Sequence, residues 1–348
     1  MQIGFLVRKL EALGPSLSTV HLIAAACNAG HDVLVCEASG WSQLDSGALM
    51  LPGIWLRSKR PDLTSRQVAG ALLARAGEAK RVYDLSSCEI VFPRIIWSPE
   101  EMHGGPLLNL LGRMADQGVL LINGPDALRR FATAHQWSEA PAEVQPPHLI
   151  TRDLAEAQEW LAGQAGDPAA ANRAGSELYA RTLHQRSGVR PTRLHPDDAQ
   201  RDTVLAGLLA SDSLVLFGLP AGAPEKRILW MDGKILGGYA VRAPAWTGAV
   251  EGRPVAPYIS DMNEREAAVY LQIEPVLRER GVKLAMIAIV DGVLSGVEAM
   301  TPGGIDCIDR LYNCRIETNI VRLAVRQANN QRSTKPAEPA PEAAPTEA

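Results

Sequence analysis

The feature that most constrains the fold is the alternation of short apolar strands with helical segments in the first third of the chain. Ile3 to Val7 is typical of a strand, Leu17 to Ala29 of a helix that ends at Gly30, and Val33 to Cys36 of a second strand. The same alternation recurs between residues 90 and 122. Strands that alternate with helices predict a parallel sheet that is covered on both faces. We therefore expect an α/β domain at the start of the chain.

The second half of the chain has a different pattern, in which short strands follow one another across tight turns. Asp-Gly pairs at positions 232–233 and 291–292 are typical of hairpin turns. Such turns predict antiparallel sheets rather than a continuation of the parallel one. The predicted strands are 214–217, 227–231, 235–241, 283–290 and a return strand that reaches Glu298.

Two helices and two irregular segments complete the prediction. Asn263 is a plausible cap for a helix from Glu264 to Arg280, and a last helix covers roughly Glu317 to Gln327. Residues 163–175 are rich in Gly, Ala, Asn and Asp and are typical of a flexible insertion. Residues 328–348 contain only Ala, Pro and polar or charged residues, which cannot bury enough apolar surface to offset chain entropy. We expect this tail to be disordered.

Charge and cysteine content exclude several classes of protein. The formal net charge of -4 over 348 residues offers no broad basic surface, so a nucleic-acid partner is not expected. No apolar run is long enough to span a membrane, and the first residues lack the order of a signal peptide. The five cysteines include no Cys-x-x-Cys pair, which favours reduced thiols and a cytoplasmic location.

Several strings, taken in order and with their spacing, resemble the bacterial glutathione synthetase family of the ATP-grasp superfamily. The resemblance spans nearly the whole chain up to the tail and implies an α/β fold with an N-terminal pre-ATP-grasp parallel-sheet domain and an α+β lid. It implies domains at 1–134 (pre-ATP-grasp), 135–220 (small lid subdomain) and 221–327 (C-terminal subdomain), followed by the tail at 328–348. The strings that carry it are 120–125 (LLINGP), 148–152 (HLITR), 226–233 (KRILWMDG), 240–244 (AVRAP) and the run from Pro275 to Pro302.

The resemblance implies an activity and its cofactors. Members of this family form an amide by transferring the γ-phosphate of ATP to a carboxylate, after which an amine attacks the acylphosphate. Such a site needs cationic side chains, a glycine-rich flap near the phosphates and carboxylates that hold Mg²⁺. ATP and Mg²⁺ are thus the implied cofactors.

Several nucleotide-contacting positions are altered. His135 matches a family lysine, and a histidine is mostly neutral near pH 7. Arg181 matches a second lysine on a lid strand, where it is either a phosphate contact or a solvated charge. The flap matches residues 184–188, of which only Gly188 keeps a glycine slot. The hinge for adenine matches 216–220, where Gly218 and its neighbours retain backbone groups but no polar side chains.

Four charged positions are better preserved. Glu225, Lys226 and Arg227 match an acidic-Lys-Arg segment that holds nucleotide and substrate, and Arg242 matches a family arginine on the next strand. The resemblance implies a catalytic role for Arg227 and Arg242 and a cofactor-binding role for Glu225 and Lys226.

The metal positions are the most altered. The family supplies an Asp from one strand and a Glu-x-Asn from its hairpin partner, and the matching positions are Ala288, Gly296 and Glu298. If the hairpin loop takes three residues, 291–293, then Ala288 lies opposite Gly296 and all three positions share one face. Glu298 is then the one remaining metal candidate, and its alternative is an acid that binds no metal.

Three functional hypotheses follow from these residues. The first is a divergent member that has lost activity and acts as a binding or regulatory module for a protein partner. The second is an active carboxylate-amine ligase with a rearranged site, for which the substrate is a small-molecule or peptide carboxylate. The third is an oligomerisation scaffold, since members of the family are often homo-oligomers.

Overall fold

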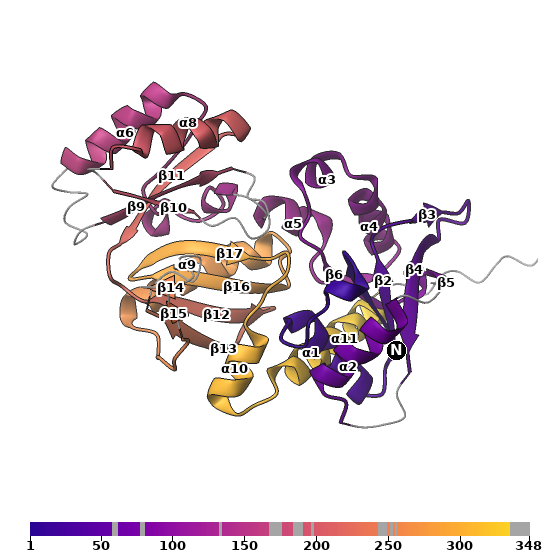
Figure 1. Ribbon diagram of the computed structural model, residues 1–348. Helices are drawn as coiled ribbons and strands as arrows, with labels where there is room; N and C mark the ends of the chain where they lie inside the picture. The colour runs from indigo at the N-terminus through magenta and orange to yellow at the C-terminus, as the bar shows by residue number, and fades with distance from the viewer. Residues whose placement is uncertain are drawn as a thin grey trace, which may run out of the picture.

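The computed structural model describes residues 1–57, 62–76, 81–131, 134–166, 176–183, 191–195, 198–242, 249–250, 253–254 and 256–334. These residues form three large sheets, which Figure 1 shows as three separate layers of strands with helices packed on them. A small two-stranded sheet of β14 (Ala249–Val250) and β15 (Arg253–Pro254) lies beside them. Within the described part of the chain, every helix is too short or too polar to cross a membrane.

The first sheet has seven strands and combines parallel and antiparallel pairs. Its order is β3-β4-β2-β1-β6-β7, with β5 paired to β4. The strands β1, β2, β6 and β7 run parallel, as the alternation predicted, whereas β4 is antiparallel to β2, β3 and β5. The sheet is therefore mixed rather than wholly parallel. Its strands are β1 (Gln2–Val7), β2 (Asp32–Glu37), β3 (Ser42–Gln43), β4 (Leu49–Leu56), β5 (Arg81–Asp84), β6 (Ile90–Arg94) and β7 (Leu120–Leu121).

Helices cover both faces of this sheet, as expected for buried parallel strands. One apolar core contains α1 and α2, and a second contains α3 and α4, on the opposite side of β1 and β2. Gly30, at the end of α1, has a φ of 79°, which explains the glycine there. The helices are α1 (Ser18–Asn28), α2 (Ser65–Ala76), α3 (Pro99–Gly104), α4 (Pro106–Asp116) and α5 (Pro125–Phe131).

The second sheet is antiparallel and has the order β10-β9-β11-β8. The helices α6 (Leu154–Gly166) and α8 (Arg201–Ser211) cover its outer face, as Figure 1 shows at the upper left. The predicted flexible insertion therefore begins later than expected, because residues 163–166 continue α6; residues 167–175 lie outside the described residues. The strands are β8 (His148–Thr151), β9 (Ser176–Thr182), β10 (Thr192–Leu194) and β11 (Leu214–Pro220).

The third sheet is also antiparallel and has the order β13-β12-β16-β17. Both predicted Asp-Gly turns are present, and Asp232 and Asp291 have φ values of 48° and 39°. The helix α9 (Glu264–Glu279) packs on one face and begins with a complete capping box of Asn263 and Glu266. The strands are β12 (Glu225–Met231), β13 (Lys234–Val241), β16 (Leu284–Val290) and β17 (Val293–Glu298).

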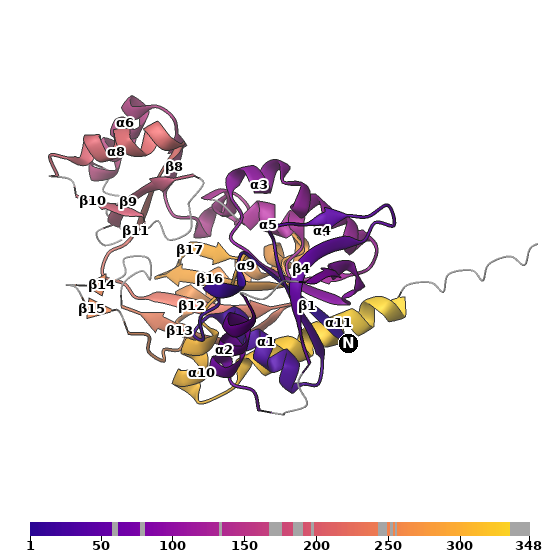
Figure 2. The ribbon, with the colours of Figure 1, turned by 45° about the vertical axis from the view of Figure 1, so that its right-hand side comes forward.

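The chain then returns to the first sheet and the helices α1 to α5 that cover it, here called the first domain. It does so through α10 (Ile305–Tyr312) and α11 (Ile316–Thr334). Figure 2 shows α11 lying along the first domain next to α1, with which it shares an apolar core. The predicted tail is corrected here, because α11 continues seven residues beyond Gln327. Ala328 is buried, and Arg332 forms a 2.7 Å ion pair with Glu89, so these residues gain contacts that composition alone did not indicate.

Asn123, just after β7, connects the first domain to the third sheet. Its side chain is buried and donates to the carbonyl oxygens of Leu284 and Ala299 at 2.7 and 2.6 Å. Its Oδ1 accepts the backbone N–H groups of Lys283 and Leu284 at 2.7 and 3.0 Å. Four hydrogen bonds therefore satisfy one buried amide and fix the start of β16 and the end of β17 against the first domain.

Candidate active site

The pairing of β12, β16 and β17 defines the floor of the candidate site. Ala288 lies opposite Arg227 on β12 and opposite Gly296 on β17, so the predicted pairing of Ala288 with Gly296 is confirmed. The predicted three-residue loop is wrong, because Val290 pairs with Val293 across a two-residue turn. An irregularity after Ala288 then shifts the pairing by one residue, so that Ala288 still lies opposite Gly296. The extra residue of this β-bulge is Ser295.

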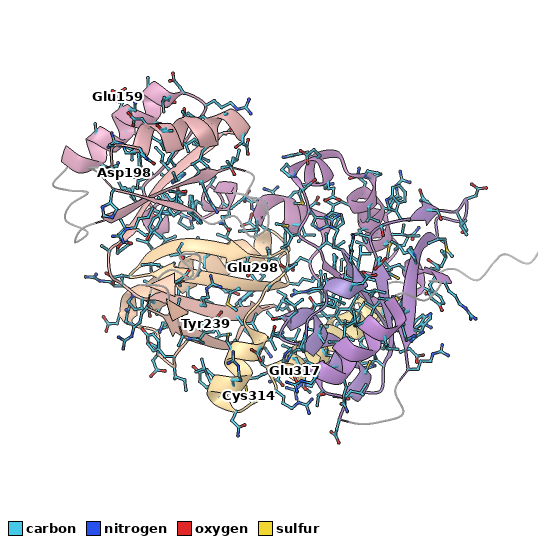
Figure 3. The ribbon with its side chains drawn as sticks, viewed as in Figure 1. Glu159, Asp198, Tyr239, Glu298, Cys314 and Glu317 are labelled. Carbon is cyan, nitrogen blue, oxygen red and sulfur yellow. The ribbon has the colours of Figure 1, made fainter. Side chains whose placement is uncertain are left out.

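Glu298 lies at the end of β17, on the face shared with Ala288 and Gly296. Figure 3 places it on the side of the third sheet that faces the first domain. Thr301 Oγ1 donates to its carboxylate at 3.3 Å. Solvent reaches the side chain, yet protein atoms crowd around it and raise the pKa of the Glu298 carboxyl, while Arg227 and Arg94 oppose that rise.

Arg94, the last residue of β6, supplies a buried cation beside Glu298. Its Nε donates to Thr19 Oγ1 and its terminal nitrogen to the carbonyl oxygen of Pro302, both at 3.0 Å. Burial lowers the pKa of Arg94 to about 10, and the charge of Glu298 opposes the shift. Within the described residues Arg94 forms no ion pair at 4 Å or less, so its charge is balanced only by this longer-range attraction.

Arg227 and Glu225 lie two residues apart on β12 and therefore point to the same face. The Glu225 side chain has no exposed area. Its Oε2 lies 3.4 Å from Arg227 Nε, and its Oε1 accepts from Ser295 Oγ at 3.1 Å. Burial lowers the pKa of Arg227, but Glu225, Tyr239 and Glu298 outweigh it and leave that pKa raised. Arg227 is therefore a fixed cation that neutralises the carboxylates around it.

Lys226 lies between Glu225 and Arg227 in sequence and points to the opposite face of β12. Its ammonium group donates to the carbonyl oxygens of Ser260 and Asp261 at 2.7 and 2.8 Å and lies 3.8 Å from Glu266. Burial lowers its pKa, and Glu266 opposes that shift. The structure thus directs Lys226 toward the start of α9 and away from Arg227.

Arg181 on β9 faces aromatic rings on the inner side of the second sheet. Its guanidinium carbon lies 5.0 Å from the ring centre of Trp137 and 5.6 Å from that of Phe217. Removal from water lowers the pKa of Arg181 to about 10. Trp137, Phe217 and Tyr179 are each 1% exposed, so Phe217 is a core residue.

Two of the other predicted positions, Gly218 and Arg242, are described by the structure and contact none of these charged residues. The Gly218 N–H donates to the Pro147 carbonyl oxygen at 2.9 Å, which uses one of the hinge backbone groups. Arg242 is exposed just after β13, and within the described residues it has no hydrogen bond or ion pair. Gly188 lies outside the described residues, as does the side chain of His135.

The residues at the family's metal position do not fit a magnesium ion. Mg²⁺ requires about six oxygen ligands in near-octahedral geometry. Of the three converging positions, Ala288 and Gly296 offer no oxygen from a side chain, and Glu298 stands alone. Over the described part of the chain, no three His, Cys, Asp or Glu side chains gather closely enough to hold a metal. Arg227 and Arg94 already supply positive charge to Glu298.

Three residues of this cluster were missed by sequence reasoning. Arg94 was detectable in principle, because a charged residue at the carboxyl end of a parallel strand often lies at a ligand site. Ser295 and Tyr239 carried no such signal, since their positions depend on the bulge in β17 and on the pairing of β13 with β12.

Comparison with known sequences finds glutathione synthetases. Residues 210–313 match the family model for the ATP-grasp domain of prokaryotic glutathione synthetase. The chain is 28% identical to a glutathione synthetase of Prochlorococcus marinus over 60% of its own length and 66% of that protein. It is 24% identical to a glutathione synthetase of Synechocystis sp., over 92% of its own length and 98% of that protein.

Solved structures share the fold at low identity. The ATP-grasp ligase PsnB, complexed with a minimal precursor, has a TM-score of 0.61 and 11% identity, covering 93% of this chain and 98% of PsnB. The D-cycloserine synthetase DcsG has a TM-score of 0.58 and 14% identity, covering 94% and 99%. At these identities the likeness shows the fold alone. The sequence matches thus support a glutathione-synthetase-like ATP-grasp protein, and the solved structures support the ATP-grasp fold.

Proposed function

We propose that this ATP-grasp protein is non-catalytic and acts as a binding or regulatory module. The observation that carries the proposal is the charge balance at the floor of the site. Glu225 and Glu298 contribute two negative charges, and Arg227 and Arg94 contribute two positive charges. The protein's own guanidinium groups therefore compensate its carboxylates.

This balance disfavours a divalent cation. A Mg²⁺ ion beside Glu298 would gain one carboxylate ligand and would experience repulsion from Arg227 and Arg94 in a region partly shielded from water. A site that binds Mg²⁺ normally carries an excess of acidic ligands. Without the metal, the repulsion among the phosphates of ATP would have to be offset by other cations.

The lid positions support the same proposal. Arg181, which matches a phosphate-contacting lysine of the family, lies against the rings of Trp137 and Phe217. A guanidinium stacked on aromatic rings gains cation–π attraction, and moving it toward a phosphate would forfeit that contact. The Gly218 N–H is also already engaged by Pro147. ATP would therefore have to displace existing contacts.

For a module of this kind the expected partner is another protein, in the cytoplasm. None of the five cysteines is paired with another, and three of them are buried, which supports that proposal. Assembly into a homo-oligomer remains a prediction from the family resemblance.

An active ATP-dependent carboxylate-amine ligase is the alternative, and one observation favours it. The register that brings positions 288, 296 and 298 together is intact, and Glu298 retains a carboxylate there. In that case Arg181, Glu225, Arg227, Arg242 and Glu298 would serve the site, and the substrate would be a small-molecule or peptide carboxylate. Several structural neighbours are described in complex with precursor peptides.

Isothermal titration calorimetry of the full chain with ATP, with and without MgCl₂, tests the proposal. We expect no increase in ATP affinity when Mg²⁺ is present. The ligase alternative predicts Mg²⁺-dependent tightening of roughly tenfold or more that Glu298→Ala abolishes. Glu159→Ala is the matched control, because Glu159 is an exposed acid on α6, far from Glu298 in Figure 3.

A further inference from the structure

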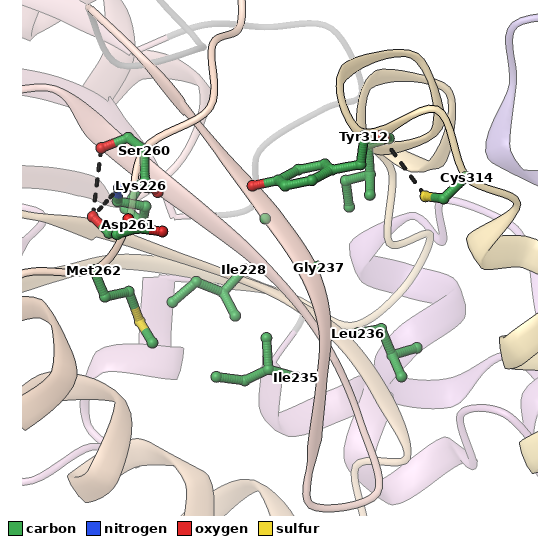
Figure 4. A pocket seen from close by; sticks show the side chains of 12 residues that line it. Lys226, Ile228, Ile235, Leu236, Gly237, Ser260, Asp261, Met262, Tyr312 and Cys314 are labelled. Atoms are coloured by element: carbon green, nitrogen blue, oxygen red, sulfur yellow. Dashed lines mark hydrogen bonds between the residues drawn. The ribbon is translucent and has the colours of Figure 1, made fainter.

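A pocket of about 340 Å³ wraps around the outer edge of β13. Lys226 and Ile228 line it on the face of β12 opposite Arg227, and Ile308 and Tyr312 of α10 line it on the other face. Figure 4 shows Lys226, Ser260 and Asp261 at one end of it and Tyr312 with Cys314 at the other, with β13 between them. Most of its lining is apolar, including Ile228, Ile235 and Met262. Lys226 lines this pocket, whereas Glu225, Arg227 and Glu298 do not, so binding here does not require the charge balance on which the proposed function rests.

The backbone of β13 is open at this pocket. In an antiparallel pair, successive residues alternate between facing their partner strand and facing away from it. Ala240 faces away from β12, since it exchanges two 2.9 Å hydrogen bonds with Tyr258. Gly238, two residues earlier, must have the same orientation, and no hydrogen bond to its outward N–H or C=O is made by any described residue.

The protein's own chain begins to pair with this edge and then leaves it. Tyr258 forms a single antiparallel bridge with Ala240, and continued pairing would bring Ser260 opposite Gly238. Instead, Lys226 binds the carbonyl oxygens of Ser260 and Asp261 and holds them toward α9. The position opposite Gly238 is therefore left to another extended backbone.

The surface around the pocket is unusually apolar for a solvent-facing region. Ile235 and Tyr312 line it and are 42% and 44% exposed, and Ile259, next to the lining residue Ser260, is 53% exposed. Exposed apolar residues that gather around a hollow often mark an interaction site. An unpaired N–H and C=O on a strand edge are complementary in partial charge to a second extended backbone.

We propose that the outer edge of β13 binds an extended peptide segment of a partner protein. The segment pairs antiparallel with Gly238 and places one apolar side chain in the pocket between Ile235, Met262 and Tyr312. Backbone hydrogen bonds then supply affinity and the apolar side chain supplies selectivity. No ATP and no metal take part in this interaction.

Selection of a phage-displayed library of random linear heptapeptides on the full chain tests the proposal. We expect enriched peptides to carry an apolar residue between residues of high strand propensity, and to lose affinity by roughly tenfold or more with Ile235→Asp. Leu271→Asp is the matched control, because Leu271 is an exposed apolar residue (68%) on α9 that does not line the pocket, and it should leave affinity unchanged.

A second measurement on the unsubstituted chain examines the backbone directly. The amide hydrogen of Gly238 should exchange slowly when an enriched peptide is bound and rapidly without it, and a peptide N-methylated at the pairing residue should not bind. Equal enrichment on the Ile235→Asp chain, or unchanged exchange at Gly238, would show that the edge of β13 is not a peptide site.

Discussion

At the scale of single residues, Asp309 has a carboxyl group whose pKa is strongly raised. It lies where α10 meets α11 and α1, and its Oδ1 accepts the Ile316 N–H at 2.7 Å. His21 Nδ1 on α1 lies 3.9 Å from the Oδ2 atom of Asp309, and Cys314 Sγ lies 3.6 Å from its Oδ1 atom. Burial and the nearby carboxyl of Glu317 raise the pKa of Asp309 to about 7, against the Ile316 hydrogen bond, which lowers it.

This shift predicts a loss of stability as the pH rises. Between the ordinary value of 3.8 and about 7, the folded chain holds a proton that the unfolded chain has released. The stabilisation is therefore complete at low pH and declines as the pH rises through about 7, by on the order of 2–4 kcal/mol. Asp309→Asn keeps an acceptor for Ile316 and removes the ionisation, so its stability relative to the unsubstituted chain should increase from pH 5 to pH 8.

Urea unfolding at the two pH values measures this change. Asp45→Asn is the control, because Asp45 is exposed and forms no hydrogen bond or ion pair within the described residues. A difference between Asp309→Asn and the unsubstituted chain that is the same at both pH values would mean that Asp309 does not carry the pH dependence.

At the scale of elements, caps and turns that depend on a few neighbouring residues could be predicted from the sequence. The capping box at Asn263 and the Asp-Gly turns, which need residues with positive φ, were found where the sequence indicated them. The pairing of Ala288 with Gly296 was predicted correctly, although the predicted three-residue loop was wrong. The turn is one residue shorter, and the extra residue of the bulge at Ser295 compensates for the difference. A bulge of this kind depends on packing around Glu225 and leaves no local sequence signature.

The C-terminal end of α11 was missed for a similar reason. Residues 328–334 have a polar composition, and their helical state depends on contacts with the first domain that composition does not reveal. Ala328 is buried there, and Arg332 pairs with Glu89 beside β6. Tertiary packing therefore extends a helix that propensity alone would end earlier.

Truncation of the chain tests the contribution of this last part of α11. A chain ending at Gln327 loses the buried Ala328 and the Arg332–Glu89 pair, and should be less stable by about 1–2 kcal/mol. A chain ending at Thr334 keeps both and should remain within about 0.5 kcal/mol of the full chain. Thermal and urea unfolding of the three chains give the comparison, and equal stability of the two truncated forms would contradict it.

At the scale of the whole molecule, three elements from distant parts of the sequence form the candidate site. β6 provides Arg94, β12 provides Arg227, and β17 provides Glu298, while Asn123 connects the first domain to the edge of the third sheet. The sequence indicated Arg227 and Glu298, because both lie within strings that resemble the family. It did not indicate that Arg94 balances Glu298, since that relation depends on how the first domain and the third sheet pack together.

The charge balance of this assembled site predicts that added carboxylates would increase its affinity for a divalent cation. Ala288→Asp combined with Gly296→Glu would add two carboxylates beside Glu298 on one face. A Cβ atom at position 296 has room, because it would lie 3.5 Å from Gln136 Nε2, an ordinary contact distance. With four acids facing two arginines, the site would attract a divalent cation, and Mn²⁺ should bind at least roughly tenfold more tightly than to the unsubstituted chain.

Electron paramagnetic resonance of Mn²⁺ measures this binding, and the double variant Ala288→Asn with Gly296→Gln is the matched control of equal size without the charge. The acidic variant should be destabilised without metal, by on the order of 1–3 kcal/mol, because its carboxylates repel one another, and Mn²⁺ should reverse that loss. If the neutral variant bound Mn²⁺ equally well, added charge would not be the cause. If neither bound it, Arg227 and Arg94 would be sufficient to exclude a cation even from a site with its full set of ligands.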